Sequence, residues 1–438
     1  MSGKELLAIE GGAPVRTEGM PPEADFFGLE ELEAVTNVMK SRALRRGNIT
    51  EEYEKKIADW FGVKHALAVT SGTTALHVAL AAIGVGPGDE VIVSPYTFVS
   101  SDTSVLEQNA VPVFADIDPD YLHLDPADIE RKITPYTKAI IPVSAYGAPV
   151  DMDPIMEIAR KHNLWVIEDD CRAIGATYKG KKSGTTGHIA VFSTVAGKVI
   201  STGEGGFAIT NDDALYEKMW SYSDFARKRS LGSSSKYHWG LPCTNYRITN
   251  LQAAIGIEQM KKLDEFVEAR NKNGRYLSEQ LKDVPGIILP KEPVWGETIY
   301  YYYLIRIQQE VLGSDMLNFA LALSAEGVFD KKLLPTTRWP ISQNLEPLFI
   351  EKSGYGGTKC PFECAHYKGK VEYGPGQCPV SEKLHEEVLW LSSVNPQMTR
   401  KDLDDIAHAV KKVVSAFLEK KVRGEKIEYA AERDRALL

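Results

Sequence analysis

A lysine with small and apolar neighbours lies in the segment FSTVAGKVISTGEGG, residues 192–206. Burial among apolar groups disfavours the charged form of a lysine, and the neutral amine is a nucleophile that can form a Schiff base with a carbonyl group. Ser193, five residues before Lys198, could donate a hydrogen bond to a phosphate group. A single lysine of this kind is more often an ordinary surface residue, so the interpretation depends on which other groups lie nearby.

Two further segments could bind the other ends of a small ligand. Residues 71–74, Ser-Gly-Thr-Thr, connect an apolar strand to a helix, and the backbone N–H groups at a helix N-terminus favour phosphate. Glu168, Asp169 and Asp170 end another apolar strand, which is where ligands bind in open α/β sheets. A carboxylate at that place can pair with the protonated nitrogen of a pyridine ring. Taken alone, each segment is also compatible with an ordinary turn.

The elements that must position these groups alternate between strand and helix. Apolar runs predict strands at 65–70, 90–95, 111–117, 138–146 and 164–170, with helical patterns such as 152–163 between the later ones. This alternation is typical of an α/β domain with a mainly parallel sheet. A long amphipathic helix is expected from residue 250, followed by an α+β region in which TIYYYYLIRI, residues 298–307, reads as a strand.

The length of 438 residues suits a large domain and a smaller one. We predict a large ligand-binding domain over residues 1–255 with an N-terminal arm, a smaller C-terminal α+β domain over 256–420, and a charged tail, 421–438, that frays. The formal net charge of −9 gives no general attraction to nucleic acid or anionic membranes. With neither a signal-peptide pattern nor a membrane-spanning apolar run in the sequence, we expect the protein to be cytoplasmic.

Four potential soft-metal ligands, Cys360, Cys364, His366 and Cys378, cluster in a segment rich in Gly and Pro. The spacing C-x3-C-x-H-x11-C is not a common zinc spacing. A loop with reduced thiols is the favoured interpretation, and a metal site is the alternative. The long segment 353–380 is itself a candidate functional loop.

The order of the three ligand-binding segments makes the chain resemble the DegT/StrS family of pyridoxal-phosphate-dependent sugar aminotransferases. The matching segments span nearly the whole chain: GGAPVR (11–16), SGTTALHVAL (71–80), PYTFVSS (95–101), IEDDCRAIGA (167–176), FSTVAGK (192–198), STGEGGFAIT (201–210), TNYRITNLQAAIGIEQMKKLD (244–264) and CPVSEKL (378–384). The resemblance implies the fold of the fold-type-I pyridoxal-phosphate aminotransferases.

The resemblance also implies a role for individual residues. Lys198 would hold pyridoxal phosphate as an internal aldimine and move the proton, and Asp169 would pair with the pyridine nitrogen. Phe98 would stack on the cofactor ring. Asn245 would reach the phosphate from a neighbouring subunit, which implies a homodimer with shared active sites. The phosphate itself would be held by Gly72, Thr73 and Ser193.

The chain departs from the family pattern at three places near the expected cofactor. Arg172 stands where Gln or His usually lies beside the phenolic oxygen, and because arginine stays protonated it would hold that oxygen as a phenolate. Asp170 and Cys171 replace two small residues. Ser144 or Ala145 stands where a histidine is common.

These features predict transfer of an amino group from glutamate or glutamine to a keto sugar or keto cyclitol. The sequence looks closest to the subgroup that aminates inososes or makes aminohydroxybenzoate-type precursors, as in antibiotic biosynthesis, and the nucleotide-sugar subgroup stays open. A sugar dehydratase or eliminase and a non-catalytic regulator with the same fold are the alternatives.

Overall fold

The structure is a computed structural model that describes residues 5–22, 26–229, 242–329, 342–392 and 394–430. Its centre is a seven-stranded sheet in which β9 runs antiparallel to both neighbours and the other strands are parallel. The predicted α/β fold with a mainly parallel sheet is therefore confirmed. In spatial order the strands are β1 (His65–Val69), β9 (Gly206–Thr210), β8 (Ile189–Ser193), β5 (Trp165–Asp169), β4 (Thr137–Ile141), β2 (Glu90–Val93) and β3 (Val111–Phe114).

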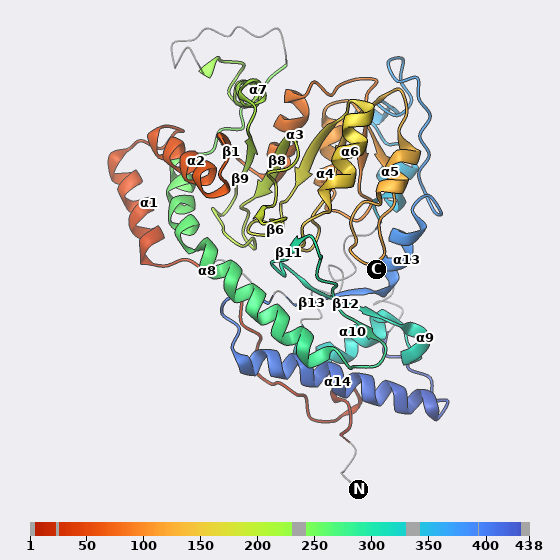
Figure 1. Ribbon diagram of the computed structural model, residues 1–438. Coiled ribbons are helices and arrows are strands. Elements are labelled where there is room, and N and C mark those ends of the chain that lie inside the picture. The colour runs from red at the N-terminus through yellow and green to blue at the C-terminus, as the bar shows by residue number, and fades with distance from the viewer. Residues whose placement is uncertain (1–4, 23–25, 230–241, 330–341, 393, 431–438) are drawn as a thin grey trace.

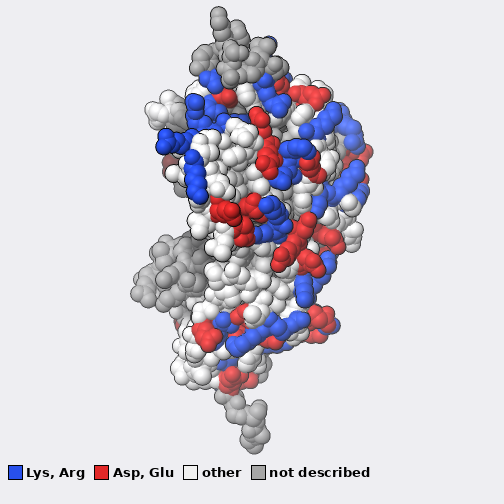
Figure 2. Space-filling view, turned by 90° about the vertical axis from the view of Figure 1, so that its left-hand side faces the viewer, with Lys and Arg blue, Asp and Glu red and all other residues white. Residues whose placement is uncertain are grey.

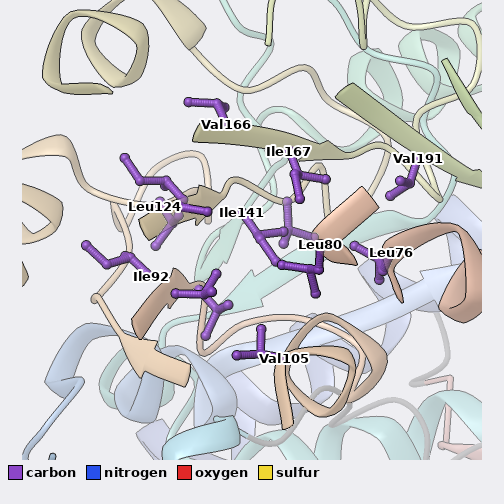
Figure 3. Packing of buried hydrophobic residues seen from close by; sticks show 14 of the residues in the cluster. Leu76, Leu80, Ile92, Val105, Leu124, Ile141, Val166, Ile167 and Val191 are labelled. Atoms are coloured by element: carbon purple, nitrogen blue, oxygen red, sulfur yellow. The ribbon is translucent and has the colours of Figure 1, made fainter. Parts of the chain in front are cut away.

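Both faces of this sheet are buried, which explains why its strands read as nearly continuous apolar runs. Along β1, Leu67 packs into one hydrophobic cluster and its neighbours Ala66 and Ala68 into another. In Figure 3, Leu76 and Leu80 lie close to apolar side chains of the sheet. The flanking helices are α1 (Leu29–Ser41), α2 (Asn48–Phe61), α3 (Gly72–Ala82), α4 (Ser100–Glu107), α5 (Pro126–Lys132), α6 (Met152–His162) and α7 (Asp213–Ser223).

The predicted long helix is α8, Asn250–Leu281. It begins where the Thr249 side chain accepts a hydrogen bond from the backbone N–H of Gln252, a capping arrangement that satisfies a free donor. Figure 1 shows α8 running from the side of α1 and α2 to the side of α14 (Arg400–Val422). The helix thus connects the large sheet to the second core.

The second core is built around the antiparallel sheet β10 (Ile287–Ile288), β12 (Tyr303–Ile307) and β13 (Val388–Ser392). The helices α9 (Gln309–Leu312), α10 (Met316–Ala325) and α14 join it. Its buried cluster also holds Leu7 from the N-terminal arm and Ile427 from the charged tail. A domain boundary at residue 255 stays a prediction.

The N-terminal arm is fixed to this core by a buried ion pair. The Lys412 ammonium lies 2.8 Å from Oε2 of Glu326, and both side chains are almost inaccessible to solvent. Glu326 also accepts hydrogen bonds from the backbone N–H groups of Ala8 and Val15, and Lys412 donates to the carbonyl of Ala13. Arm and core therefore share one polar network.

The segment 342–387, which lies between α10 and β13 in the sequence, packs against the core of the large sheet. Phe349, Phe362 and Tyr367 are buried in the cluster of the seven-stranded sheet. The short elements here are η4 (Gln343–Leu345), α12 (Pro347–Ile350), η5 (Tyr355–Gly357) and α13 (Pro379–Glu387); elsewhere they are η1 (Ala8–Glu10) and the small sheet of β6 (Thr177–Tyr178), β7 (Lys181–Lys182) and β11 (Gly296–Glu297).

Charges on the surface are mixed. Figure 2 shows basic and acidic side chains interspersed over the face in view. Within the described ranges, no helix has the length and apolar character needed to cross a membrane.

Candidate active site

A cavity of about 360 Å³ opens at the carboxyl ends of the central strands. This volume lies within the range of small-molecule sites. Every predicted site residue except Asn245 lines it: Gly72, Thr73, Phe98, Asp169, Arg172, Ser193 and Lys198. The structure thus brings together the segments 71–74, 168–170 and 192–206. They meet because parallel strands end at one edge of a sheet.

Lys198 lies on the Gly-rich turn between β8 and β9, partly open to the cavity. Burial lowers the pKa of its amine to about 7, and repulsion from the Arg172 guanidinium acts in the same direction, while Cys171 and Asp169 oppose it. The amine also lies 5.1 Å from the centre of the Tyr301 ring, whose hydroxyl donates to the carbonyl of Gly197. An amine with this pKa is substantially neutral at neutral pH and can act as a nucleophile.

Asp169 ends β5 and is held by two donors. The Ser101 hydroxyl donates to its Oδ2 over 2.7 Å, and the backbone N–H of Cys171 donates to its Oδ1 over 3.2 Å. Ser101 is in turn linked to Thr97 by a bond of 2.7 Å between their hydroxyls. These contacts fix a buried carboxylate at the cavity wall.

The first turn of α3 forms another wall. The Ser71 hydroxyl accepts from the backbone N–H of Thr74 and caps the helix, and the Thr73 hydroxyl lies 2.7 Å from that of Ser100. A side chain at Gly72 would come within 2.9 Å of Cβ of Ser193, so only glycine allows this close approach to the end of β8. The turn therefore offers backbone and hydroxyl donors to an anion.

Arg172 joins the cavity to the second core. Its guanidinium lies 5.2 Å from the ring centre of Trp390 on β13 and 6.0 Å from that of Tyr302, and the two rings stack on each other. It also donates to the carbonyl of Ala145 over 3.2 Å. Stacked aromatic faces orient a guanidinium well, so this cation has a defined place in the cavity.

Two departures from the family pattern are bonded to each other. The Ser144 hydroxyl donates to Asp170 over 2.6 Å, and the Ser183 hydroxyl donates to the same carboxylate over 2.7 Å. Burial raises the pKa of Asp170 above its usual range, and the two hydroxyls act against this shift. Burial, with the nearby Asp170 carboxyl, also raises the pKa of Glu168, although the backbone N–H groups of Gly184, Thr186 and Gly187 donate to it. Both carboxyls thus have structural partners.

Phe98 and Asn245 lie at less enclosed positions. The Phe98 side chain lines the cavity and is 46% exposed. Asn245 is exposed in the segment before α8, where it pairs with Asp224 in an isolated β-bridge and does not line the cavity. Its predicted role in a neighbouring active site stays a prediction.

The contributions of Ser101, Tyr301, Tyr302 and Trp390 to this site are not predicted from the sequence. Ser101 was part of a matching segment, PYTFVSS, but nothing in its spacing predicted a bond to Asp169. The tyrosine run 300–303 was predicted to be strand throughout, yet β12 begins only at Tyr303, and Tyr300 adopts a left-handed φ of 46°. This break directs Tyr301 and Tyr302 to the cavity.

The cysteine-rich segment lies away from the cavity. Cys378 is fully buried at the start of α13, whereas Cys360 and Cys364 are partly exposed. Considering the described residues alone, no group of three or more His, Cys, Asp or Glu side chains could hold a metal ion. The four potential ligands therefore do not meet as a zinc site in this structure.

The cavity fits pyridoxal phosphate in each of its functional groups. The amine of Lys198 can take the aldehyde, the Asp169 carboxylate suits a protonated ring nitrogen, and the first turn of α3 suits the phosphate. The absence of a side chain at Gly72 lets this turn lie close to Ser193, the third residue expected to hold the phosphate.

Comparisons with known proteins agree with this fit. The sequence model that represents the DegT/DnrJ/EryC1/StrS aminotransferase family matches residues 27–361 of this chain. GDP-perosamine synthase of Caulobacter vibrioides is 46% identical over 262 residues, covering 60% of this chain and 70% of that protein. The L-glutamine:2-deoxy-scyllo-inosose aminotransferase of Streptomyces kanamyceticus is 33% identical over 432 residues, covering 93% and 96% of the two chains.

A solved structure extends the likeness to the fold. The crystal structure of 3-amino-5-hydroxybenzoic acid synthase superposes with a TM-score of 0.77 at 26% identity, covering 92% of this chain and all of that one. Since the enzymes of this family depend on pyridoxal phosphate, the chemistry of the cavity and the matches point the same way. The chain belongs to the DegT/DnrJ/EryC1/StrS family and is a pyridoxal-phosphate-dependent aminotransferase.

Proposed function

We propose that this aminotransferase moves an amino group from glutamate or glutamine to a keto sugar or keto cyclitol, and that Lys198 is its cofactor-bearing residue. The observation that carries the proposal is the meeting of Lys198, Asp169 and the first turn of α3 in one cavity. A relative named as a glutamine:inosose aminotransferase supports the cyclitol, and the GDP-perosamine synthases support a nucleotide sugar.

When bound, pyridoxal phosphate supplies an electron sink for negative charge at the amino-bearing carbon. Asp169, fixed by Ser101 and the Cys171 N–H, would keep the ring nitrogen protonated. Gly72, Thr73 and Ser193 would hold the phosphate, and Phe98 would cover the ring. Arg172 would hold the phenolic oxygen as an anion.

The Nζ atom of Lys198 is suited to moving a proton in both halves of the reaction. A group with a pKa near the working pH is protonated and deprotonated at little cost, which is the property of an efficient general acid–base. Its placement on a turn fixed by the Tyr301 hydroxyl limits how far the amine moves. Lys198 is thus proposed as the proton carrier.

The donor can be tested with purified, cofactor-loaded enzyme in single half-reactions. Glutamate and glutamine are supplied separately, and the 2-oxo product is measured by chromatography together with the visible spectrum of the cofactor. We expect 2-oxo product with at least one donor, in an amount matching the enzyme. No product with either would contradict the proposed donor class.

The acceptor is then tested in the second half-reaction. Enzyme carrying the donor's amino group is offered 2-deoxy-scyllo-inosose or a nucleoside-diphosphate keto sugar, and the aminated product is identified by mass spectrometry. Amination of one class identifies the acceptor. If the keto substrate instead loses water or another leaving group and is not aminated, the result would favour the dehydratase or eliminase alternative.

The cofactor linkage is tested by borohydride reduction and peptide mapping. The pyridoxyl group should lie on Lys198 and be absent from a Lys198→Ala variant. Lys179→Ala is a matched control, because Lys179 is exposed and pairs with Asp153 away from the cavity. A pyridoxyl group on another lysine of the wild-type protein would refute the assignment.

We further propose that the protein is a homodimer with shared sites. Leu29, Leu32 and Met39 lie on one face of α1 and are 80%, 62% and 55% exposed, which is an apolar surface that a second copy would cover. Asn245, exposed and outside its own cavity, would then reach the phosphate of the partner subunit. A cytoplasmic location stays a prediction.

Shared sites can be tested with mixed subunits. Lys198→Ala and Asn245→Asp chains are each expected to be poorly active, but hybrid dimers combine both lesions in one site and leave the other intact. Activity should therefore return after subunit exchange. If exchange is verified by mass spectrometry and activity stays absent, the sites are not shared.

A further inference from the structure

Asn245 lies on a short stretch of chain, residues 244–247, whose backbone is held to the large domain at two points. Asn245 pairs with Asp224, and Arg247 pairs with Val69, the last residue of β1, in two isolated antiparallel bridges. The Arg247 guanidinium also forms an ion pair with the Asp224 carboxylate. The backbone of this stretch is therefore attached to the end of β1, two residues before the turn 71–74 that is expected to hold phosphate.

Tyr246, between these two bridges, connects the same stretch to helix α3 through its side chain. Its hydroxyl oxygen lies 2.8 Å from Nδ1 of His77, and its backbone N–H donates to the carbonyl of Ser223 over 2.9 Å. A hydroxyl both donates and accepts, so the bond to His77 can form with either neutral tautomer of the ring. This bond links the Asn245 stretch to the helix whose first turn offers donors to an anion.

The surroundings of His77 hold its ring in one orientation. Burial lowers the pKa of the imidazole to about 4, so the ring is neutral at neutral pH. Nε2 lies 3.4 Å from the hydroxyl of Tyr222, which accepts a hydrogen bond of 3.2 Å from the Gln108 side chain. The Glu107 carboxylate, 3.6 Å from Nδ1, lies beyond hydrogen-bond distance. With the tyrosine hydroxyls near its two nitrogens, the ring is suited to fix where Tyr246 lies.

We propose that His77 is a positioning residue for the active site of the partner subunit, because it holds Tyr246 and thereby the neighbouring Asn245 in place. This inference rests on the proposed dimer, in which Asn245 reaches the phosphate of the other subunit. His77 does not line the cavity of its own subunit, so we assign its effect to the stretch that it holds. Loss of one hydrogen bond between neutral groups should weaken pyridoxal phosphate binding about twofold to tenfold.

The test asks in which subunit the effect of His77 appears. Hybrid dimers are purified with two different affinity tags, so that each contains one Lys198→Ala chain and one site able to link the cofactor. In the first hybrid, His77→Phe is in the chain that keeps Lys198, and in the second it is in the Lys198→Ala chain. The cofactor is removed, and the dissociation constant of pyridoxal phosphate is measured from the visible absorbance of the linked cofactor during titration.

We expect wild-type affinity in the first hybrid and weakened affinity in the second. In the second hybrid, the Asn245 stretch that reaches the competent site comes from the chain that carries His77→Phe. Weakened affinity in the first hybrid with wild-type affinity in the second would place the effect of His77 in its own subunit and overturn the proposal. Equal affinities in the two hybrids would also overturn it.

Two further variants test whether the bond between His77 and Tyr246 carries the effect. Tyr246→Phe removes the other partner of the bond and should reproduce the result, and the double variant should be no weaker than either single one. His65→Phe is the matched control, because Nε2 of His65 lies 2.7 Å from the Asp213 carboxylate at the other end of β1. It should leave the affinity of both hybrids unchanged.

A parallel pair of hybrids with Asn245→Asp in place of His77→Phe separates this inference from the proposed dimer. If Asn245→Asp weakens the site of the other subunit and His77→Phe does not, the role of His77 is refuted and the shared sites stand. If Asn245→Asp has no effect on the site of the other subunit, both proposals are refuted.

Discussion

The Ser101 hydroxyl donates a hydrogen bond of 2.7 Å to Oδ2 of Asp169 inside the core of the large domain. A carboxylate accepting this bond and a second one from a backbone N–H is held in one orientation toward the cavity. Ser101 does not line the cavity, so it would act on the cofactor through Asp169, as a positioning residue.

Replacing Ser101 by alanine should reduce kcat with little change in cofactor content. A hydrogen bond to a charged group contributes about 1.5–3 kcal/mol, which corresponds to roughly a tenfold to hundredfold loss if it acts fully in the transition state. Thr103→Ala is the control, since its hydroxyl donates to the Val99 carbonyl one turn earlier in the same stretch of chain. Equal kcat in wild type and Ser101→Ala would show that Asp169 does not need this donor.

The lowered pKa of Lys198 predicts how fast the cofactor-free protein takes up pyridoxal phosphate at different pH. Only the neutral amine reacts, so the uptake rate should rise through a midpoint near pH 7 and then level off. In Arg172→Gln the nearby positive charge is gone, the pKa of Lys198 rises, and the midpoint should move to higher pH. Stopped-flow absorbance measures both curves, and an unchanged midpoint would mean that Arg172 exerts no effect on the amine.

The buried pair Lys412–Glu326 predicts a large loss of stability when one partner alone is removed. Lys412→Met leaves the Glu326 carboxylate buried without its cation, and breaking such a pair costs about 3–5 kcal/mol of unfolding free energy. The double variant Lys412→Met/Glu326→Gln should recover part of this loss. The exposed pair Lys55–Asp59 is the control: Lys55→Met should change stability by about 1 kcal/mol or less in urea unfolding.

Asp102 predicts a dependence of stability on pH. It is fully buried, neither carboxyl oxygen has a hydrogen-bond partner within the described parts of the chain, and burial and the nearby Asp169 raise its pKa well above the ordinary value. Because the folded state favours the protonated form, its stabilising contribution is complete below about pH 4 and is lost as the pH rises through the folded pKa.

Asp102→Asn cannot lose a proton, so its unfolding free energy should fall less between pH 4 and pH 8 than that of the wild type. Urea unfolding at several pH values in that range measures the difference. Asp120→Asn, at an exposed residue paired with Lys291, should keep the wild-type slope. Parallel curves for wild type and Asp102→Asn would indicate that Asp102 does not change its protonation on unfolding.

The sequence was sufficient to predict which parts of the large domain meet. Lys198, Asp169 and Gly72 each follow or end a strand, and strand ends in a parallel sheet converge whatever the details of packing. The strand 138–146 was predicted too long, since β4 ends at Ile141, directly before Pro142. Proline has no N–H to continue the hydrogen-bonded ladder, so this limit could have been read from the sequence.

The contribution of the second core could not be predicted in the same way. Trp390 and Tyr302 reach Arg172 only because one core docks against the other, and no local period encodes that docking. The break at Tyr300 has the same origin: a side chain at Gly147 would come within 2.8 Å of the backbone N of Tyr301, and that packing overrides the strand preference of four tyrosines.

The attachment of the N-terminal arm has a consequence for synthesis on the ribosome. The bond from Lys412 to the Ala13 carbonyl joins residues separated by 399 positions. At about 5–20 residues per second, roughly 20–80 s pass between the translation of the arm and that of its partner helix. For most of this interval the backbone N–H groups of Ala8 and Val15 lack the Glu326 carboxylate, and throughout it the Ala13 carbonyl lacks Lys412, so the arm is among the last parts of this core to reach its final position.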